Sequence, residues 1–415
     1  MSKEGHSLAV GFAPPGPFPA KFRIADSIYF GMMNFVEDER IIVTLVSSED
    51  LPDRIPEVSF VSSEAKGKLF KLLRNGRQTF SNSDFGTVTY ACFYGVFAAA
   101  LSSAEPPSTT RVVQLRFDQL REWNTSQIIR KAYLGNSLTI TTSGEVSERY
   151  SMGKAQLVFH AAALTTDSLT EVDVKQDNFL ELTLEEHTSI AELGSALRSI
   201  QHLCDFVFGN PVHFGTIDAI DSDPDPSLNQ TKDRCSLFLP LRKRGGHSEL
   251  VENMNWIVVR EMKNKFEHIV TSWDRLWSRF ADPIAVLYNS YYGDTFIDTK
   301  FMNAVAFLDS YGIVFRSDKR RLKARLLDFL TEYKDEFGPF LKTPLAELAV
   351  RMSKTRNALA HLDARYSDFV DQSLGSLAAC VFLLSECVIA SELGISGKVR
   401  SDIVSSRIQR TRFDI

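Results

Sequence analysis

Residues 258–280, VVREMKNKFEHIVTSWDRLWSRF, mark the point where the chain changes its pattern of apolar residues. The apolar residues of this stretch recur at steps of three and four, which places them along one side of a long α-helix. Strand signals dominate before this stretch, and further helical patterns follow it. We therefore expect the chain to change from β to α structure here. The apolar side of the helix carries Val258, Met262, Phe266, Ile269, Trp273, Leu276 and Phe280.

The chain favours β-strands from about Phe22 to Leu184. Residues 40–46 and 87–93 are rich in β-branched and aromatic side chains and lie between clusters of turn residues. Residues 180–184 alternate leucine with polar residues, which is typical of a strand with one solvated face. These patterns predict a curved, largely antiparallel β-domain.

Helical patterns fill the rest of the chain. One helix is expected at about 190–207, ending near Gly209. Further helices are expected at about 296–311, 318–333, 344–362 and 367–393, the last of them ending at Gly394. The predicted fold class is α+β, with a β-rich N-terminal domain at 1–245 and an all-α bundle at 246–415.

Composition is typical of a soluble globular protein. The 415 residues carry a net charge of −5, so nucleic acid would have to be bound by local basic patches. The five cysteines are scattered without a CxxC pair, which suits a reducing compartment. Residues 1–21 lack the apolar run of a signal peptide, and the apolar stretch 377–390 is too short to span a bilayer. A cytoplasmic protein with no membrane role is expected.

The chemically distinctive segment is the octet Arg356-Asn357-Ala358-Leu359-Ala360-His361-Leu362-Asp363. A guanidinium can hold a phosphodiester in a fixed fork, and an imidazole can move a proton near neutral pH. At about 100° per residue, Arg356 flanks the apolar seam of its helix and His361 lies roughly 140° further round. Asn357 and His361 share one face, with Lys354 and Arg365 close to it.

Two interpretations of that outer face are open. It is either an ordinary solvated helix surface or one wall of a composite cleft that a second copy of the chain completes. Ala358 and Ala360 beside the motif would allow the close approach that a composite cleft needs. The second interpretation predicts a homodimer through the helical domain.

Three segments together resemble a known family. Residues 115–123, LRFDQLREW, combine a strand with a Leu-x-x-Trp sequence. Residues 292–311, YGDTFIDTKFMNAVAFLDSY, include a long predicted helix, and the third segment is the octet. The set is similar to the ApeA family of bacterial abortive-infection, anti-phage proteins, which join a β-rich N-terminal domain to a C-terminal HEPN domain. The octet itself resembles the R-N-x-x-x-H motif of HEPN ribonucleases.

The resemblance implies a HEPN helical bundle in which motifs from two protomers face each other. The family usually has Glu where this chain has Asp309, and a His-Arg pair where this chain has Gly312-Ile313. Asp309 is expected to orient Arg356 through its shorter carboxylate. The catalytic residues implied are Arg356, Asn357, His361 and Asp309.

The chemistry expected is metal-independent cleavage of RNA. His361 would act as general base on the 2′-hydroxyl or as acid on the 5′-oxygen, and Arg356 would stabilise the charge on the phosphorus oxygens. The products would be a 2′,3′-cyclic phosphate and a 5′-hydroxyl. No metal or cofactor is expected, because the other histidines show no paired ligand spacing.

Three basic runs are candidates for positioning RNA, although such runs are more often solvated surfaces. They are residues 319–325, residues 242–244, and a tail carrying Arg400, Arg407, Arg410 and Arg412. The RNA-binding residues predicted are Lys354, Arg365, Lys319, Arg320 and Lys323.

Two other functions stay open on the sequence. The helical domain would be a non-catalytic HEPN scaffold that dimerises or binds nucleic acid, or the β-domain would sense a phage-encoded trigger while the helices dimerise. The expected partners are an RNA substrate and a second copy of the chain, with higher assembly undecided. A constitutive ribonuclease would poison its host, so an inactive resting state is expected.

Overall fold

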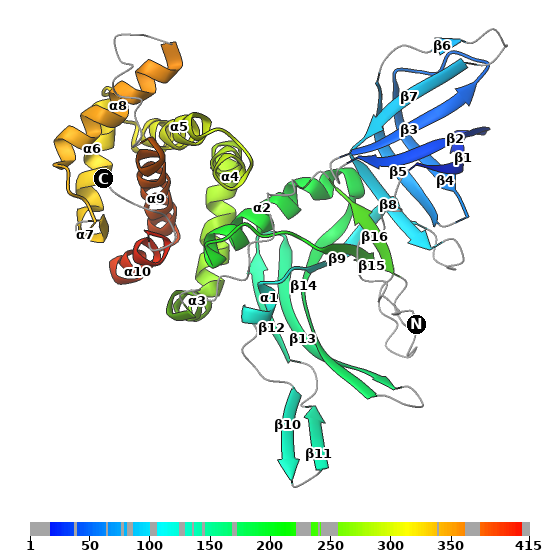
Figure 1. Cartoon of the computed structure of the whole chain (residues 1–415), viewed down its shortest axis with the longest axis horizontal. Coiled ribbons are helices and arrows are strands. Elements are labelled where there is room, and N and C mark those ends of the chain that lie inside the picture. Colours follow the sequence, from blue (N-terminus) through cyan, green and yellow to red (C-terminus); the bar gives the residue numbers. More distant parts are fainter. Residues whose placement is uncertain are drawn as a thin grey trace. The chain divides into compact units, whose positions relative to one another are not determined.

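The computed structural model describes residues 17–36, 40–63, 65–75, 79–80, 86–99, 106–123, 129–134, 137–142, 146–167, 172–220, 234–239, 241, 256–337, 340–361 and 374–408. The chain forms two compact units. The β-rich unit comprises residues 1–198 and 213–243, and the helical unit comprises residues 199–212 and 244–415. The fold class predicted from sequence, a β-rich N-terminal part followed by an all-α part, is confirmed (Figure 1).

Six strands of the β-rich unit close into a small barrel. They follow the order β5-β4-β1-β2-β3-β7, and pairing of Leu73 with Ala91 joins β7 back to β5. Alternate residues of these strands point inward and fill the barrel with apolar side chains such as Phe22, Val43 and Phe60. The first eight strands are β1 (Phe18–Ile24), β2 (Ser27–Val36), β3 (Arg40–Ser47), β4 (Arg54–Val61), β5 (Ala65–Arg74), β6 (Thr79–Phe80), β7 (Gly86–Cys92) and β8 (Tyr94–Ala99).

A second run of antiparallel strands continues from β8 in the order β16-β15-β9-β14-β13-β12. The Leu-x-x-Trp sequence after β9 forms the short helix α1, and its Trp123 stacks on Phe159 with ring centres 4.8 Å apart. The elements are β9 (Thr109–Arg116), α1 (Leu120–Trp123), β12 (Val146–Met152), β13 (Ala155–Asp167), β14 (Val172–Ser189), β15 (Thr216–Ile220) and β16 (Arg234–Phe238), with β10 (Ile129–Leu134) and β11 (Ser137–Thr142) as a separate hairpin.

Helix α2 (Ile190–Phe208) contributes to both units. Its residues from Ser199 onward belong to the helical unit, where the Ser199 hydroxyl accepts a hydrogen bond from the Trp273 indole at 3.0 Å. The other helices are α3 (Trp256–Lys263), α4 (Phe266–Tyr292), α5 (Ile297–Arg316), α6 (Leu322–Glu332), α7 (Lys334–Phe337), α8 (Leu345–His361), α9 (Leu374–Glu392) and α10 (Gly397–Ile408).

The helix expected over 258–280 is present as two pieces with a kink. A turn at Asn264 and Lys265 separates α3 from α4, and α4 departs from helical geometry at Phe280. Pro283 explains the kink, because proline lacks an N–H and its ring clashes with the carbonyl four residues earlier. Helices α7 and α10 were not expected from the sequence.

Helix α9 forms the centre of the helical unit. It is long and apolar enough to cross a membrane by length and composition, but most of it is buried, as in the core helix of a soluble protein. Its Glu386 is fully buried and pairs with Arg407 of α10, which also donates to the Phe206 carbonyl at 2.6 Å. This arrangement joins α9, α10 and the end of α2 around one buried ion pair.

Candidate functional site

Helix α8 carries the candidate catalytic residues. Its buried side packs against α5 and α6 through Leu348, Ala349, Met352, Thr355 and Ala358. The spacing of these residues leaves Arg356 and Asn357 half-buried at the edge of the packed side. His361 is exposed at the last residue of the helix. The helix therefore holds all three side chains within its last two turns.

Arg356 and Asn357 contact each other directly. The Arg356 guanidinium donates a hydrogen bond to the Asn357 side-chain oxygen at 3.3 Å. That contact leaves the amide NH₂ of Asn357 as a donor on the face that it shares with His361. The end of α8 thus carries a cation, an amide donor and an imidazole, of which the amide and the imidazole share one face.

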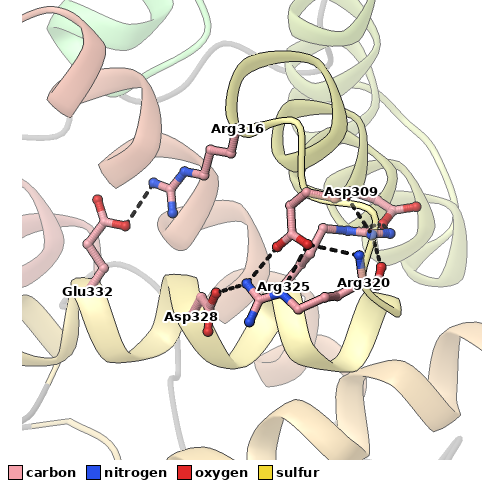
Figure 2. A network of polar contacts seen from close by, with 7 residues as sticks. Asp309, Arg316, Arg320, Arg325, Asp328 and Glu332 are labelled. Carbon is pink, nitrogen blue, oxygen red and sulfur yellow. Dashed lines mark hydrogen bonds and ion pairs between the residues drawn. The ribbon is translucent and has the colours of Figure 1, made fainter.

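Asp309 is placed differently from the expectation. Its carboxylate accepts hydrogen bonds from Arg325 of α6, at 2.9 Å from the Arg325 Nε (Figure 2). The hydrogen bond of Arg356 goes to Asn357 instead. The expectation that Asp309 orients Arg356 is corrected accordingly. The physical reason is that Arg325 is buried and its charge requires a nearby carboxylate.

Gly312 makes the contact between Arg325 and Asp309 possible. A Cβ atom added at Gly312 would lie 2.8 Å from the Arg325 Cδ, closer than side chains tolerate. The Arg325 side chain thus passes over the glycine, and its guanidinium also donates to the carbonyls of Asp318 and Arg320. Gly312 stands where the family usually has the first residue of a His-Arg pair. The glycine leaves space for the side chain of Arg325 from α6.

The densest basic run forms ion pairs within its own unit. Arg320 pairs with Asp318 at 2.7 Å and also with Asp328 (Figure 2). Its hydrogen bonds lower the pKa of Asp318 to about 2, so this carboxylate is ionised near neutral pH. Arg320, predicted to bind RNA, is therefore already paired, whereas Lys319 and Lys323 are exposed. Lys354 is also exposed, on α8.

A second set of contacts fastens α5 to α6 and α9. Arg316 pairs with Glu332 at 2.7 Å (Figure 2) and lies over the ring of Phe329, 4.4 Å from its centre. Tyr311 donates to Glu392, and burial together with that hydrogen bond raises the pKa of Tyr311. Reasoning from sequence missed these pairs, because each joins residues that lie far apart in the chain.

The basic tail is also engaged in structural contacts. Arg400 pairs with Glu336 at 2.8 Å and donates to the Ile395 carbonyl, and Arg407 pairs with the buried Glu386. Neither side chain is a surface cation available for RNA. Arg365, the run 242–244, Arg410 and Arg412 lie outside the described residues. Within the described part of the chain, no group of three or more His, Cys, Asp or Glu side chains could hold a metal ion.

Comparison with known proteins decides the family. A sequence model of the ApeA N-terminal domain 1 matches residues 22–279, more than half of the chain. The chain belongs to the ApeA family. Membership in this family indicates an anti-phage defence protein. The ApeA match begins in β1 and ends inside α4, so it covers the segment 115–123 but neither the segment 292–311 nor the octet. No curated protein and no solved structure matches the chain.

Proposed function

We propose that this ApeA-family protein is a cytoplasmic anti-phage effector whose helical unit is a HEPN endoribonuclease that needs no metal. The observation that supports it is the placement of Arg356, Asn357 and His361 near the end of α8. There the arginine and asparagine contact each other and the histidine is exposed. Family membership supports the defence role, and the octet supports the chemistry.

In the proposed reaction, His361 accepts the proton of the ribose 2′-hydroxyl as that oxygen attacks phosphorus. The bond from phosphorus to the 5′-oxygen breaks, and the leaving oxygen takes a proton from a protonated His361 imidazole. The products are a 2′,3′-cyclic phosphate and a 5′-hydroxyl. Arg356 stabilises the charge that grows on the non-bridging oxygens. Asn357 holds the Arg356 guanidinium through its side-chain oxygen.

The proposal includes a second copy of the chain. Arg356 and His361 point about 140° apart around α8, so one helix does not direct both groups at the same phosphate. A facing α8 from a second protomer would place the His361 of one copy near the Arg356 of the other. Lys319, Lys323 and Lys354, all exposed, are the described cations best suited to bind the flanking phosphates.

The proposal is tested by expressing the wild type, His361→Ala and Arg356→Ala in a phage-sensitive bacterium and mapping the ends of total RNA. The wild type should produce new 5′-hydroxyl ends and arrest growth upon infection. Each substitution should reduce cleavage by roughly 100-fold or more. Glu347→Ala, exposed in the first turn of the same helix, is the matched control and should behave as wild type.

The scaffold alternative predicts a different result. If His361→Ala and Arg356→Ala remain folded and protect against phage as well as the wild type does, cleavage is not the effector activity. The proposal is then wrong, and the helical unit acts by assembly or binding alone. Circular dichroism and size-exclusion chromatography of each variant separate this outcome from loss of the fold.

A further inference from the structure

The outer surface of the barrel carries a regular array of cations and apolar side chains. Residues opposite one another in antiparallel strands point to the same face. One row across the strands therefore comprises Lys66, Val61, Lys21, Phe30, Val46 and Thr87. The next row comprises Lys68, Ser59, Arg23 and Ile28. We name these ten residues the β1–β2 face.

The apolar members of this face are unusually exposed. Ile28 is 65% exposed, Phe30 is 60% exposed and Val61 is 56% exposed, although each lies within a paired strand. Met32, one alternate position beyond Phe30 on the same side of β2, is 41% exposed. The barrel core on the other side of these strands is complete without them. Exposed patches of this kind mark interaction surfaces.

Every charged residue in the two rows is a cation. Lys21 and Arg23 are exposed and lie two residues apart on β1, so their side chains are about 6.6 Å apart along the strand. The Lys68 ammonium lies 3.6 Å from the carboxylate of Glu57 in the adjoining row, and it donates a hydrogen bond to the Ser108 hydroxyl. Because two copies of a cationic surface repel each other, this face does not suit self-association. Its charge is complementary to a polyanion.

The position of Phe30 narrows the class of polyanion. The Lys21 ammonium lies over the Phe30 ring, 5.7 Å from its centre, so a cation and an exposed aromatic ring form one contact pair on this face. An exposed aromatic ring beside cations is how single-stranded nucleic acid is held without sequence preference. A membrane surface fits less well, because Lys21 lies between Val61 and Phe30 rather than around an apolar centre.

We infer that the β1–β2 face binds single-stranded nucleic acid, with a base stacked on Phe30 and phosphates bound by Lys21 and Arg23. This site is separate from the octet on α8 and does not depend on cleavage. Lys21 and Arg23 were not singled out in the sequence, because they are isolated cations there. The barrel register brings them onto one face with the lysines of β5.

Fluorescence anisotropy of the full chain with a labelled oligouridylate of about 12 nucleotides tests this inference. His361→Ala serves as the background throughout, so that binding is measured without cleavage. Lys21→Glu combined with Arg23→Glu should weaken binding at least tenfold. The combined substitution should also make the slope of log affinity against log salt shallower by about 1.4, since two phosphate contacts are lost. Phe30→Ala should weaken binding at least about fivefold, and Phe30→Tyr should retain it.

Arg149→Glu combined with Lys154→Glu is the matched control, because both residues are exposed in the same unit away from this face. It should bind as the background protein does. The inference is overturned if the background protein does not bind the oligonucleotide, or if the control loses affinity to the same extent. It is also overturned if the face variants lose binding only to phosphatidylglycerol vesicles, since the partner would then be a membrane. Thermal unfolding confirms that every variant is folded.

Discussion

At the scale of the residue, Arg325 has a role that its position in a basic run does not suggest. It is buried, and it donates to the Asp309 carboxylate and to two backbone carbonyls. Arg325→Ala should lower the free energy of unfolding by about 3 kcal/mol, because it leaves a carboxylate without its buried partner. Urea unfolding followed by tryptophan fluorescence measures this, since Trp256, Trp273 and Trp277 lie in helices α3 and α4.

The control for this prediction is Lys323→Ala, two residues earlier on α6 and exposed. It should change the free energy of unfolding by less than about 0.5 kcal/mol. Equal midpoints for Arg325→Ala and the wild type would show that the pair with Asp309 contributes nothing to stability.

At the scale of the element, Gly312 determines how α5 and α6 fit together. Alanine in a helix is favoured over glycine by about 1 kcal/mol, so Gly312→Ala would ordinarily stabilise α5. Here the added Cβ would displace the Arg325 side chain, so the substitution should destabilise the wild-type protein. In the Arg325→Ala background the obstacle is gone, and the same substitution should stabilise. A double-mutant cycle of urea unfolding measures this change of sign. Destabilisation in both backgrounds would mean that Gly312 is needed for another reason.

At the scale of the whole molecule, the end of α2 is fastened to a helix some two hundred residues later. Arg407 of α10 donates to the Phe206 carbonyl and pairs with Glu386, and Gly209 adopts a left-handed conformation against it. Arg407→Ala should therefore speed hydrogen exchange in residues 199–212 and in α10, while strands of the barrel keep their protection. Exchange followed by mass spectrometry resolves these segments.

Arg400→Ala is the comparison for this whole-molecule prediction. Arg400 pairs with Glu336 of α7, so its loss should speed exchange in α7 and leave residues 199–212 unchanged. Faster exchange in 199–212 for both variants would show that either substitution destabilises the whole of α10. The contact of Arg407 would then not stabilise α2 specifically.

Local pattern was sufficient to predict most of the helices and strands. Periodicity predicted α2, α5, α6 and α8 to within a few residues at most ends, and enrichment in β-branched and aromatic residues between turn clusters predicted β3 and β7. Gly394 ends α9 with a positive φ as expected for a glycine after a helix. These features were predictable because helix and strand periods depend on near neighbours. α7 and α10 were missed because they are short or only weakly amphipathic in sequence.

Local sequence patterns were enough to predict the fold class, the family resemblance and the clustering of Arg356, Asn357 and His361, which lie within six residues of one helix. Which charged side chains form ion pairs depends instead on how the chain packs. The tertiary structure assigned Asp309 to Arg325, paired Arg320, Arg400 and Arg407 with carboxylates, and gathered Lys21 and Arg23 with Phe30 on one barrel face. The physical reason is that an ion pair depends on distance in space, and these partners come together only through helix packing and strand register.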